Sequence, residues 1–84
     1  MITQNFYISK DKMIASKTYL QILDEIKTIL NDKRFDPSTR IQKKNLNEAI
    51  LVIISFIDHT QGTLFWELLK DKGIGHGNFL MNLN

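Results

Sequence analysis

The chain has 84 residues, with 11 Lys and Arg, 9 Asp and Glu, and a formal net charge of +2. This length suits one domain, and 43% hydrophobic with 24% charged residues excludes global disorder. The chain has no cysteine, which excludes disulfide bonds, thiolate metal sites and cysteine nucleophiles and is typical of a protein in the reducing cytoplasm.

The small size of the chain limits its hydrophobic core. A domain of this length buries only roughly 60–65% of the surface that its unfolded chain exposes. Self-association as a homodimer, or docking on a partner protein, is therefore expected. The most apolar run, Ala49–Ile57, is much shorter than the about 20 residues that cross a bilayer, so no membrane contact is expected.

The first predicted helix is Lys10–Asn31. Its apolar residues recur three and four positions apart: Tyr19, Leu23, Ile26 and Leu30. This spacing predicts an amphipathic helix, with Ser9 or Ser16 as its cap. Residues 1–9 are an extended lead-in, in which Asn5–Ile8 suits a short strand.

The second predicted helix is Pro37–His59. Asp36 suits the N-cap position and Pro37 the first helical position. One apolar stripe follows: Leu46, Ile50, Ile53 and Ile57. The β-branched residues of Ile50–Ile54 leave a strand open as the alternative, but the length and the polar first turns favour a helix.

The third predicted helix is the short segment Leu64–Lys72. Gly62 is expected to break the chain before it, with Thr63 as the cap. Gly73 is expected to end the helix in a left-handed conformation, with Ile74 folding back on the last turn. The two long helices lie antiparallel and the third packs across them, so the predicted fold is all-α, a small helical bundle.

Residues 73–84 are interpreted as a glycine hinge and an apolar C-terminal arm. The end of the arm is either a short strand that pairs with Asn5–Ile8 or a flexible arm that docks on this protein or on a partner. If Leu64 and Leu68 face the core, Trp66 points outward, and Trp is a residue type enriched in binding hot spots; for Trp66 taken alone, packing in the core is the favoured alternative. The predicted protein-binding residues are Trp66, Phe79, Leu80, Met81 and Leu83.

This layout loosely resembles the immunity proteins that protect producers of pediocin-like bacteriocins. The matching residues are Lys72–Gly75 and Phe79–Met81, a short part of the chain. That family has more helices than are predicted here, so the sequence is assigned to no family.

No arrangement of residues predicts catalysis. His59, near the end of the second helix, and His76, in a glycine-rich loop, lie in separate segments. No spacing suits a catalytic triad, a carboxylate pair or a metal site, so no enzyme activity, metal or cofactor is expected. The alternating glycines of Gly73–Gly77 follow a helix, which indicates a helix stop and not a phosphate-binding loop.

The sequence therefore predicts a non-enzymatic protein that binds a partner protein, as an inhibitor, immunity protein or regulator. The alternative is a nucleic-acid-binding regulator with a basic patch on the first turns of the second helix. Its residues are Lys33, Arg34, Arg40, Lys43 and Lys44. Cations near a helix N-terminus oppose the helix dipole, which indicates an anionic partner.

Overall fold

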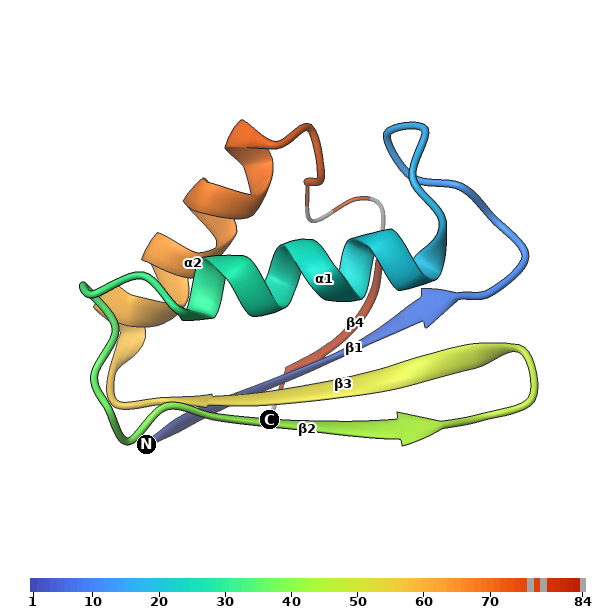
Figure 1. The fold of residues 1–84 in the computed structure, drawn as a ribbon. Helices are drawn as coiled ribbons and strands as arrows, with labels where there is room; N and C mark the ends of the chain where they lie inside the picture. The colour runs from blue at the N-terminus through green and yellow to red at the C-terminus, as the bar shows by residue number, and fades with distance from the viewer. Residues whose placement is uncertain (76, 78, 84) are drawn as a thin grey trace.

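The computed structural model describes residues 1–75, 77 and 79–83, with residues 80–83 described by their backbone. The elements are β1 (Ile2–Ser9), α1 (Tyr19–Leu30), β2 (Arg40–Asn45), β3 (Ala49–Phe56), α2 (His59–Asp71) and β4 (Leu80–Leu83). The strands form one antiparallel sheet in the order β2-β3-β1-β4, and α1 and α2 cover the same face of it (Figure 1). This is the split βαβ, or ferredoxin-like, arrangement. The predicted all-α bundle is wrong: the fold is α/β.

The largest correction concerns residues 37–59, most of which form a β-hairpin and not a helix. β2 and β3 pair antiparallel across it, with Ile41 opposite Ile54. Along β3, Val52, Ile54 and Phe56 are 0% exposed beneath the helices, whereas the residues between them lie on the other face. Because those intervening residues are mostly apolar too, the two-residue period of the strand is hidden in the sequence. The strand alternative for Ile50–Ile54 is the correct one.

Asp36 and Pro37 begin a turn and not a helix. Asp36 Oδ1 accepts hydrogen bonds from the backbone N–H of Ser38 at 2.8 Å and from its hydroxyl at 2.6 Å. The N–H of Thr39 donates to the carbonyl of Asp36 at 3.0 Å. The carboxylate thus binds the backbone two residues on, as Asp does in turns, and the chain enters β2.

α1 is shorter than predicted because a tight turn precedes it. The backbones of Ile14 and Lys17 exchange two hydrogen bonds, and the residues between them, Ala15 and Ser16, have φ values of 51° and 62°. Two consecutive positive φ values cannot continue a right-handed helix. The cap is Thr18, neither Ser9 nor Ser16. In a capping box, the hydroxyl of Thr18 accepts from the N–H of Gln21 and the Gln21 side chain accepts from the N–H of Thr18.

α2 begins earlier than predicted and ends within one residue of the predicted end. Its N-cap is Asp58, not Thr63, and Gly62 lies inside the helix, where a Cβ would come within 3.2 Å of Gln4 Nε2. At the other end Gly73 has a φ of 82°, and the N–H of Ile74 donates to the carbonyl of Leu69 at 3.1 Å. The predicted left-handed glycine stop is therefore confirmed.

The C-terminal segment is part of the sheet. β4 pairs antiparallel with β1, with Leu80 opposite Tyr7 and Leu83 opposite Gln4. Just before it, Phe79 is 8% exposed, and its ring centroid lies 4.9 Å from that of Phe6. Of the two alternatives for this segment, the structure has the strand. Within the described residues, neither helix is long and apolar enough to cross a membrane.

Candidate functional site

The candidate site is the face of the sheet that no helix covers (Figure 1). Side chains alternate between the two faces of a strand, so the neighbours of the buried residues Phe6, Val52 and Ile54 point to this side. With β2 added by register, this open face comprises Thr3, Asn5, Tyr7, Arg40, Gln42, Lys44, Leu51, Ile53 and Ser55.

The centre of the open face is apolar and its rim is polar. Two rows cross the strands there: Tyr7, Leu51 and Lys44 in one, and Asn5, Ile53 and Gln42 in the next. Leu51 and Ile53 are half-buried, yet neither packs against the core. At one end the hydroxyls of Thr3 and Ser55 lie 3.4 Å apart. The amide oxygen of Asn5 is buried and makes no hydrogen bond with any described residue.

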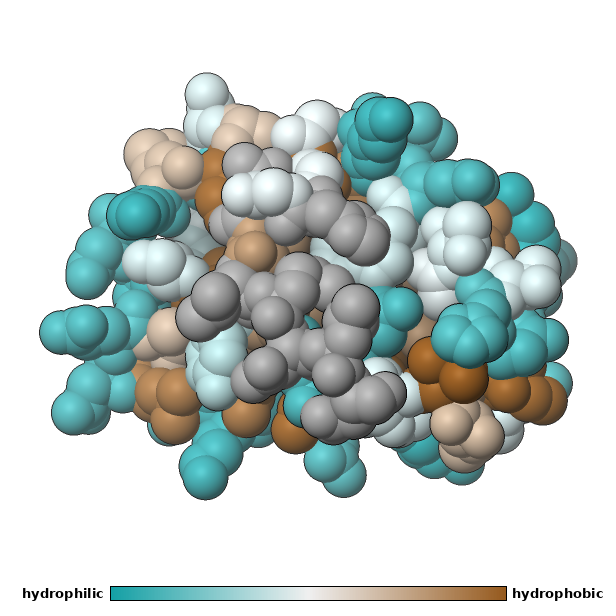
Figure 2. All heavy atoms as spheres, turned by 180° about the vertical axis from the view of Figure 1, so that it is seen from behind, coloured by the Kyte–Doolittle hydropathy of each residue, from teal (hydrophilic) through white to brown (hydrophobic). Residues whose placement is uncertain are grey.

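No acidic residue lies on any of the strands. All nine Asp and Glu belong to helices, turns or loops, whereas β2 carries Arg40, Lys43 and Lys44. Seen from the β4 side, hydrophobic and hydrophilic residues alternate along the lower edge of the molecule, which faces away from the helices (Figure 2). The open face therefore combines apolar groups with positive charge alone.

The predicted basic patch is divided among three places, and its predicted position on a helix is wrong. Arg40 and Lys44 point to the open face, and Lys43 points to the opposite side of β2. Lys33 and Arg34 follow α1 in a loop. The charge of Arg34 is compensated, because its Nε and Nη2 bind the two carboxylate oxygens of Asp32 at 3.0 and 2.9 Å. This pairing lowers the pKa of Asp32 to about 2.

Trp66 faces the core and not solvent. It is 6% exposed, its Nε1–H donates to Gln4 Oε1, and its ring centroid lies 5.3 Å from that of Phe6. The outward direction assumed that Leu64 and Leu68 face the core, whereas the buried side chains of this stretch are those of Phe65, Trp66 and Leu69. The buried Trp66 and Phe79 hold the C-terminal segment on the core, so a role for them in binding stays a prediction. The side chains of the other three predicted residues, Leu80, Met81 and Leu83, lie outside the described part of the structure.

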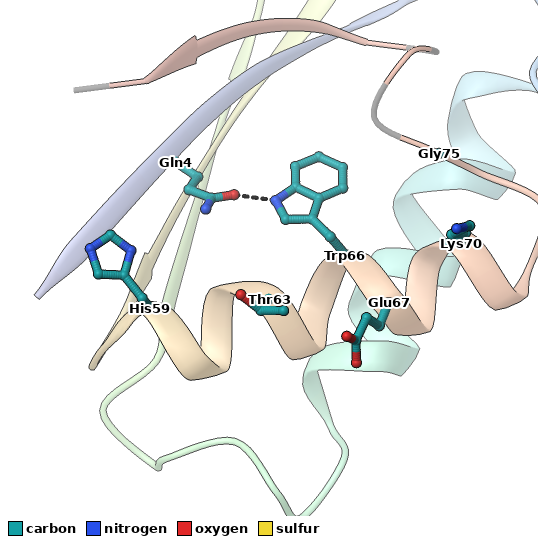
Figure 3. Close-up of a pocket in the computed structure, with 7 residues that line it drawn as sticks. All are labelled: Gln4, His59, Thr63, Trp66, Glu67, Lys70 and Gly75. Atoms are coloured by element: carbon teal, nitrogen blue, oxygen red, sulfur yellow. Dashed lines mark hydrogen bonds between the residues drawn. The ribbon is translucent and has the colours of Figure 1, made fainter.

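A hollow of about 490 Å³ lies along one flank of α2, beside Gln4 of β1 (Figure 3). It is lined by Gln4, His59, Thr63, Trp66, Glu67, Lys70 and Gly75. His59 is the first residue of α2. The prediction that it lies near the C-terminal end of a helix is wrong. Among the described residues, no hydrogen bond or ion pair joins His59, Glu67 and Lys70.

In residues 1–75, 77 and 79–83, no group of three His, Asp or Glu side chains is placed to hold a metal ion. The second histidine, His76, lies outside the described residues. The expectations that the protein is not an enzyme and uses no cofactor stay predictions.

No family model matches the chain, and neither the curated proteins nor the solved structures contain a significant match to it.

Sequence reasoning missed the apolar part of the open face, namely Tyr7, Leu51 and Ile53. The signal was present in the run Ala49–Ile57, which is apolar at nearly every position. Such a run is typical of a strand that is buried on both faces. Here the helices cover one face only, so the run contains more apolar residues than the core uses.

Proposed function

We propose that this protein is a non-enzymatic binding module that receives a partner protein on its open face, as an inhibitor, immunity protein or regulator would. The observation that supports this is the surplus of apolar residues on β3. Leu51 and Ile53 sit on a face that nothing in the described chain covers, beside Tyr7 on β1. A partner that covers this face supplies the second layer that such a strand normally has.

The arrangement of the open face suits a protein partner. An apolar centre with a polar rim is typical of protein–protein interfaces. Full burial of an aliphatic side chain such as Leu51 or Ile53 contributes about 1.5–3 kcal/mol, and part of that remains available because both are only half-buried. Arg40 and Lys44 at the rim favour a partner with acidic residues around its own apolar patch.

The test is affinity capture from the host with three versions of the tagged protein. Leu51→Thr with Ile53→Thr removes the apolar centre and keeps residues that suit a strand. Leu20→Thr is the matched control, because Leu20 is 61% exposed on α1. A partner captured by the wild type and by the control, and absent from the capture with the double variant, is the expected result. A partner that the double variant retains at equal yield contradicts the proposal.

Single-stranded nucleic acid is the second candidate, and the charge of the open face favours it. An aromatic side chain on a sheet, next to cations and without nearby acids, is how several RNA-binding domains hold unpaired bases. Tyr7 supplies the ring, and Arg40 and Lys44 supply the cations. This class is second because the rest of the centre, Leu51 and Ile53, is aliphatic and does not stack with bases.

Fluorescence anisotropy with labelled single-stranded DNA and RNA of random sequence tests this second candidate. Each phosphate that a cation neutralises adds about 0.7 to the slope of log K against log salt, so Arg40→Gln with Lys44→Gln is expected to lower that slope by about 1.4. Lys43→Gln is the control, because Lys43 lies on the other side of β2. No binding at about 50 mM salt, or equal slopes for the two variants, excludes the open face as a nucleic-acid site.

We also propose a cytoplasmic location, which the absence of cysteine supports. The homodimer expected from the small core stays a prediction. A melting temperature that rises with protein concentration would indicate it.

A further inference from the structure

β2 is an edge strand whose outer side is free. All six of its residues are exposed, and β3 is its only neighbour in the described sheet (Figure 1). Its backbone makes hydrogen bonds with β3 and with no other described segment. The N–H and C=O groups of alternate residues therefore point outward, ready to pair with another extended chain.

A hollow with both apolar and charged walls lies beside this edge, on the side of the sheet that carries the helices. It has a volume of about 600 Å³ and lies between the end of α1 and the start of β2. Leu30, Phe35 and Ile41 supply its apolar walls, and Ile41 is 38% exposed on β2 itself. Thr39 also lines the hollow, and its hydroxyl oxygen has no hydrogen-bond partner among the described residues.

The surroundings of the hollow are positively charged. Lys27 and Lys33 line it, and Lys43 lies on the same side of β2 as Ile41. Within the described part of the chain, none of these three lysines forms an ion pair. Of the two acids that line the hollow, Asp32 is paired with Arg34, whereas Asp36 accepts hydrogen bonds from Ser38 and keeps its negative charge. The three lysines therefore outnumber the one uncompensated acid.

We infer that β2 binds an acidic, extended segment of the partner protein as an added strand, with one apolar side chain of that segment in the hollow. In strand addition, backbone hydrogen bonds supply the affinity, and pockets for alternate side chains supply the specificity. The free edge, the adjacent hollow and the unpaired lysines are the three elements of such a site. The inference rests on the proposed function in one respect, namely that the partner is a protein.

A second copy of the chain fits this edge poorly. Pairing two β2 strands would bring Arg40, Lys43 and Lys44 of both copies together with no acidic residue between them. Like charges on paired strands are destabilising, and lysines on an edge strand are a common protection against self-association. An acidic segment converts the same cations into attractive contacts.

The test uses a fluorescein-labelled peptide of about eight alternating Glu and Val residues, at about 0.15 M salt so that distant charges are screened. The controls are a peptide of alternating Lys and Val, and the acidic peptide with a central Pro, which cannot pair along the strand. We expect saturable binding of the acidic peptide with a Kd below about 1 mM, at least about tenfold tighter than either control. Backbone amide NMR shifts should concentrate at residues 40–45.

Two variants make the test specific. Lys43→Glu is expected to weaken the binding of the acidic peptide by about tenfold or more, because it reverses a charge beside the hollow. Lys12→Glu, which makes the same charge change in an exposed loop between β1 and α1, is expected to leave the affinity within about twofold.

Several results would overturn the inference. The inference is wrong if the acidic peptide does not bind at about 1 mM, if the acidic and basic peptides bind equally, or if the amide shifts lie away from β2. Shifts at residues 40–45 that depend on protein concentration without peptide would identify a second copy as the occupant. Binding of single-stranded DNA that Lys43→Glu abolishes would identify a nucleic acid instead. If capture depends on Leu51 and Ile53 but the peptide does not shift β2, the proposed function stands and strand addition fails.

Discussion

Phe79→Ala tests whether the C-terminal segment belongs to the folded core. In the structure Phe79 is 8% exposed, and its ring centroid lies 4.9 Å from that of Phe6 and 6.0 Å from that of Trp66. Truncation of a buried Phe to Ala costs about 3–5 kcal/mol. Because Phe79 lies beside an edge strand, where neighbours can partly fill the space, we expect the lower end, about 3 kcal/mol.

This loss is large for so small a protein. At about 0.05–0.15 kcal/mol per residue, a chain of 84 residues has a total stability of about 4–13 kcal/mol. With a urea m-value of about 1–1.5 kcal/mol/M, the midpoint of unfolding should fall by about 2–3 M.

Urea unfolding followed by the fluorescence of Trp66 measures this change directly, because the chain has a single tryptophan and it touches the mutated site. Far-UV circular dichroism provides a second probe, and coincident transitions support two-state unfolding. Leu20→Ala, at a residue that is 61% exposed, is the control and should change stability by less than about 0.5 kcal/mol. A midpoint for Phe79→Ala within about 0.3 M of the wild type would refute the reasoning and favour the alternative, in which the C-terminal segment is a flexible arm.

Three further predictions concern single positions. Gly73→Ala should destabilise by about 1–2 kcal/mol in urea unfolding, because Ala is strained at a φ of 82°; an unchanged midpoint would contradict the left-handed stop. Ser16→Gly should raise stability by about 0.5–1 kcal/mol, because Ser16 has a φ of 62°, which glycine adopts without strain. A decrease in stability would contradict backbone strain at Ser16. The hydrogen bond from Lys72, at 2.8 Å, lowers the pKa of Glu25 below its ordinary value of 4.5. The ion pair therefore stabilises the fold fully above pH 4.5, and this stabilisation disappears as the pH falls through the lowered pKa of Glu25. Urea midpoints of Glu25→Gln and wild type should therefore differ at pH 7 and converge near pH 2, and a constant difference would exclude the ion pair as the cause.

Local sequence was sufficient to predict those features of the structure that depend only on residues close together in the chain. The end of α2 is an example. Gly73 and Ile74 form a stop whose hydrogen bonds reach back only to Leu69 and Lys70, so its signal lies within a few residues. The strand character of Asn5–Ile8 was likewise visible in its β-branched and aromatic residues.

Residues 37–59 were misassigned because their structure depends on distant pairing. Helical and strand periods compete in a run that is apolar at almost every position, and the choice is made by the pairing of β3 with β1, such as Val52 with Phe6. The outward direction considered for Trp66 was wrong for the same reason, because that direction depends on how α2 lies against β1, where Gln4 accepts the hydrogen bond from the indole of Trp66.

The candidate site shows the same division. The sequence alone revealed the cations Arg40 and Lys44 and an excess of apolar residues in Ala49–Ile57. It did not reveal that these residues share one uncovered face, because residues of different strands become neighbours only through the sheet register. Composition and local stops are properties of short segments, whereas a surface is a property of the assembled sheet, and here the surface is what supports a function.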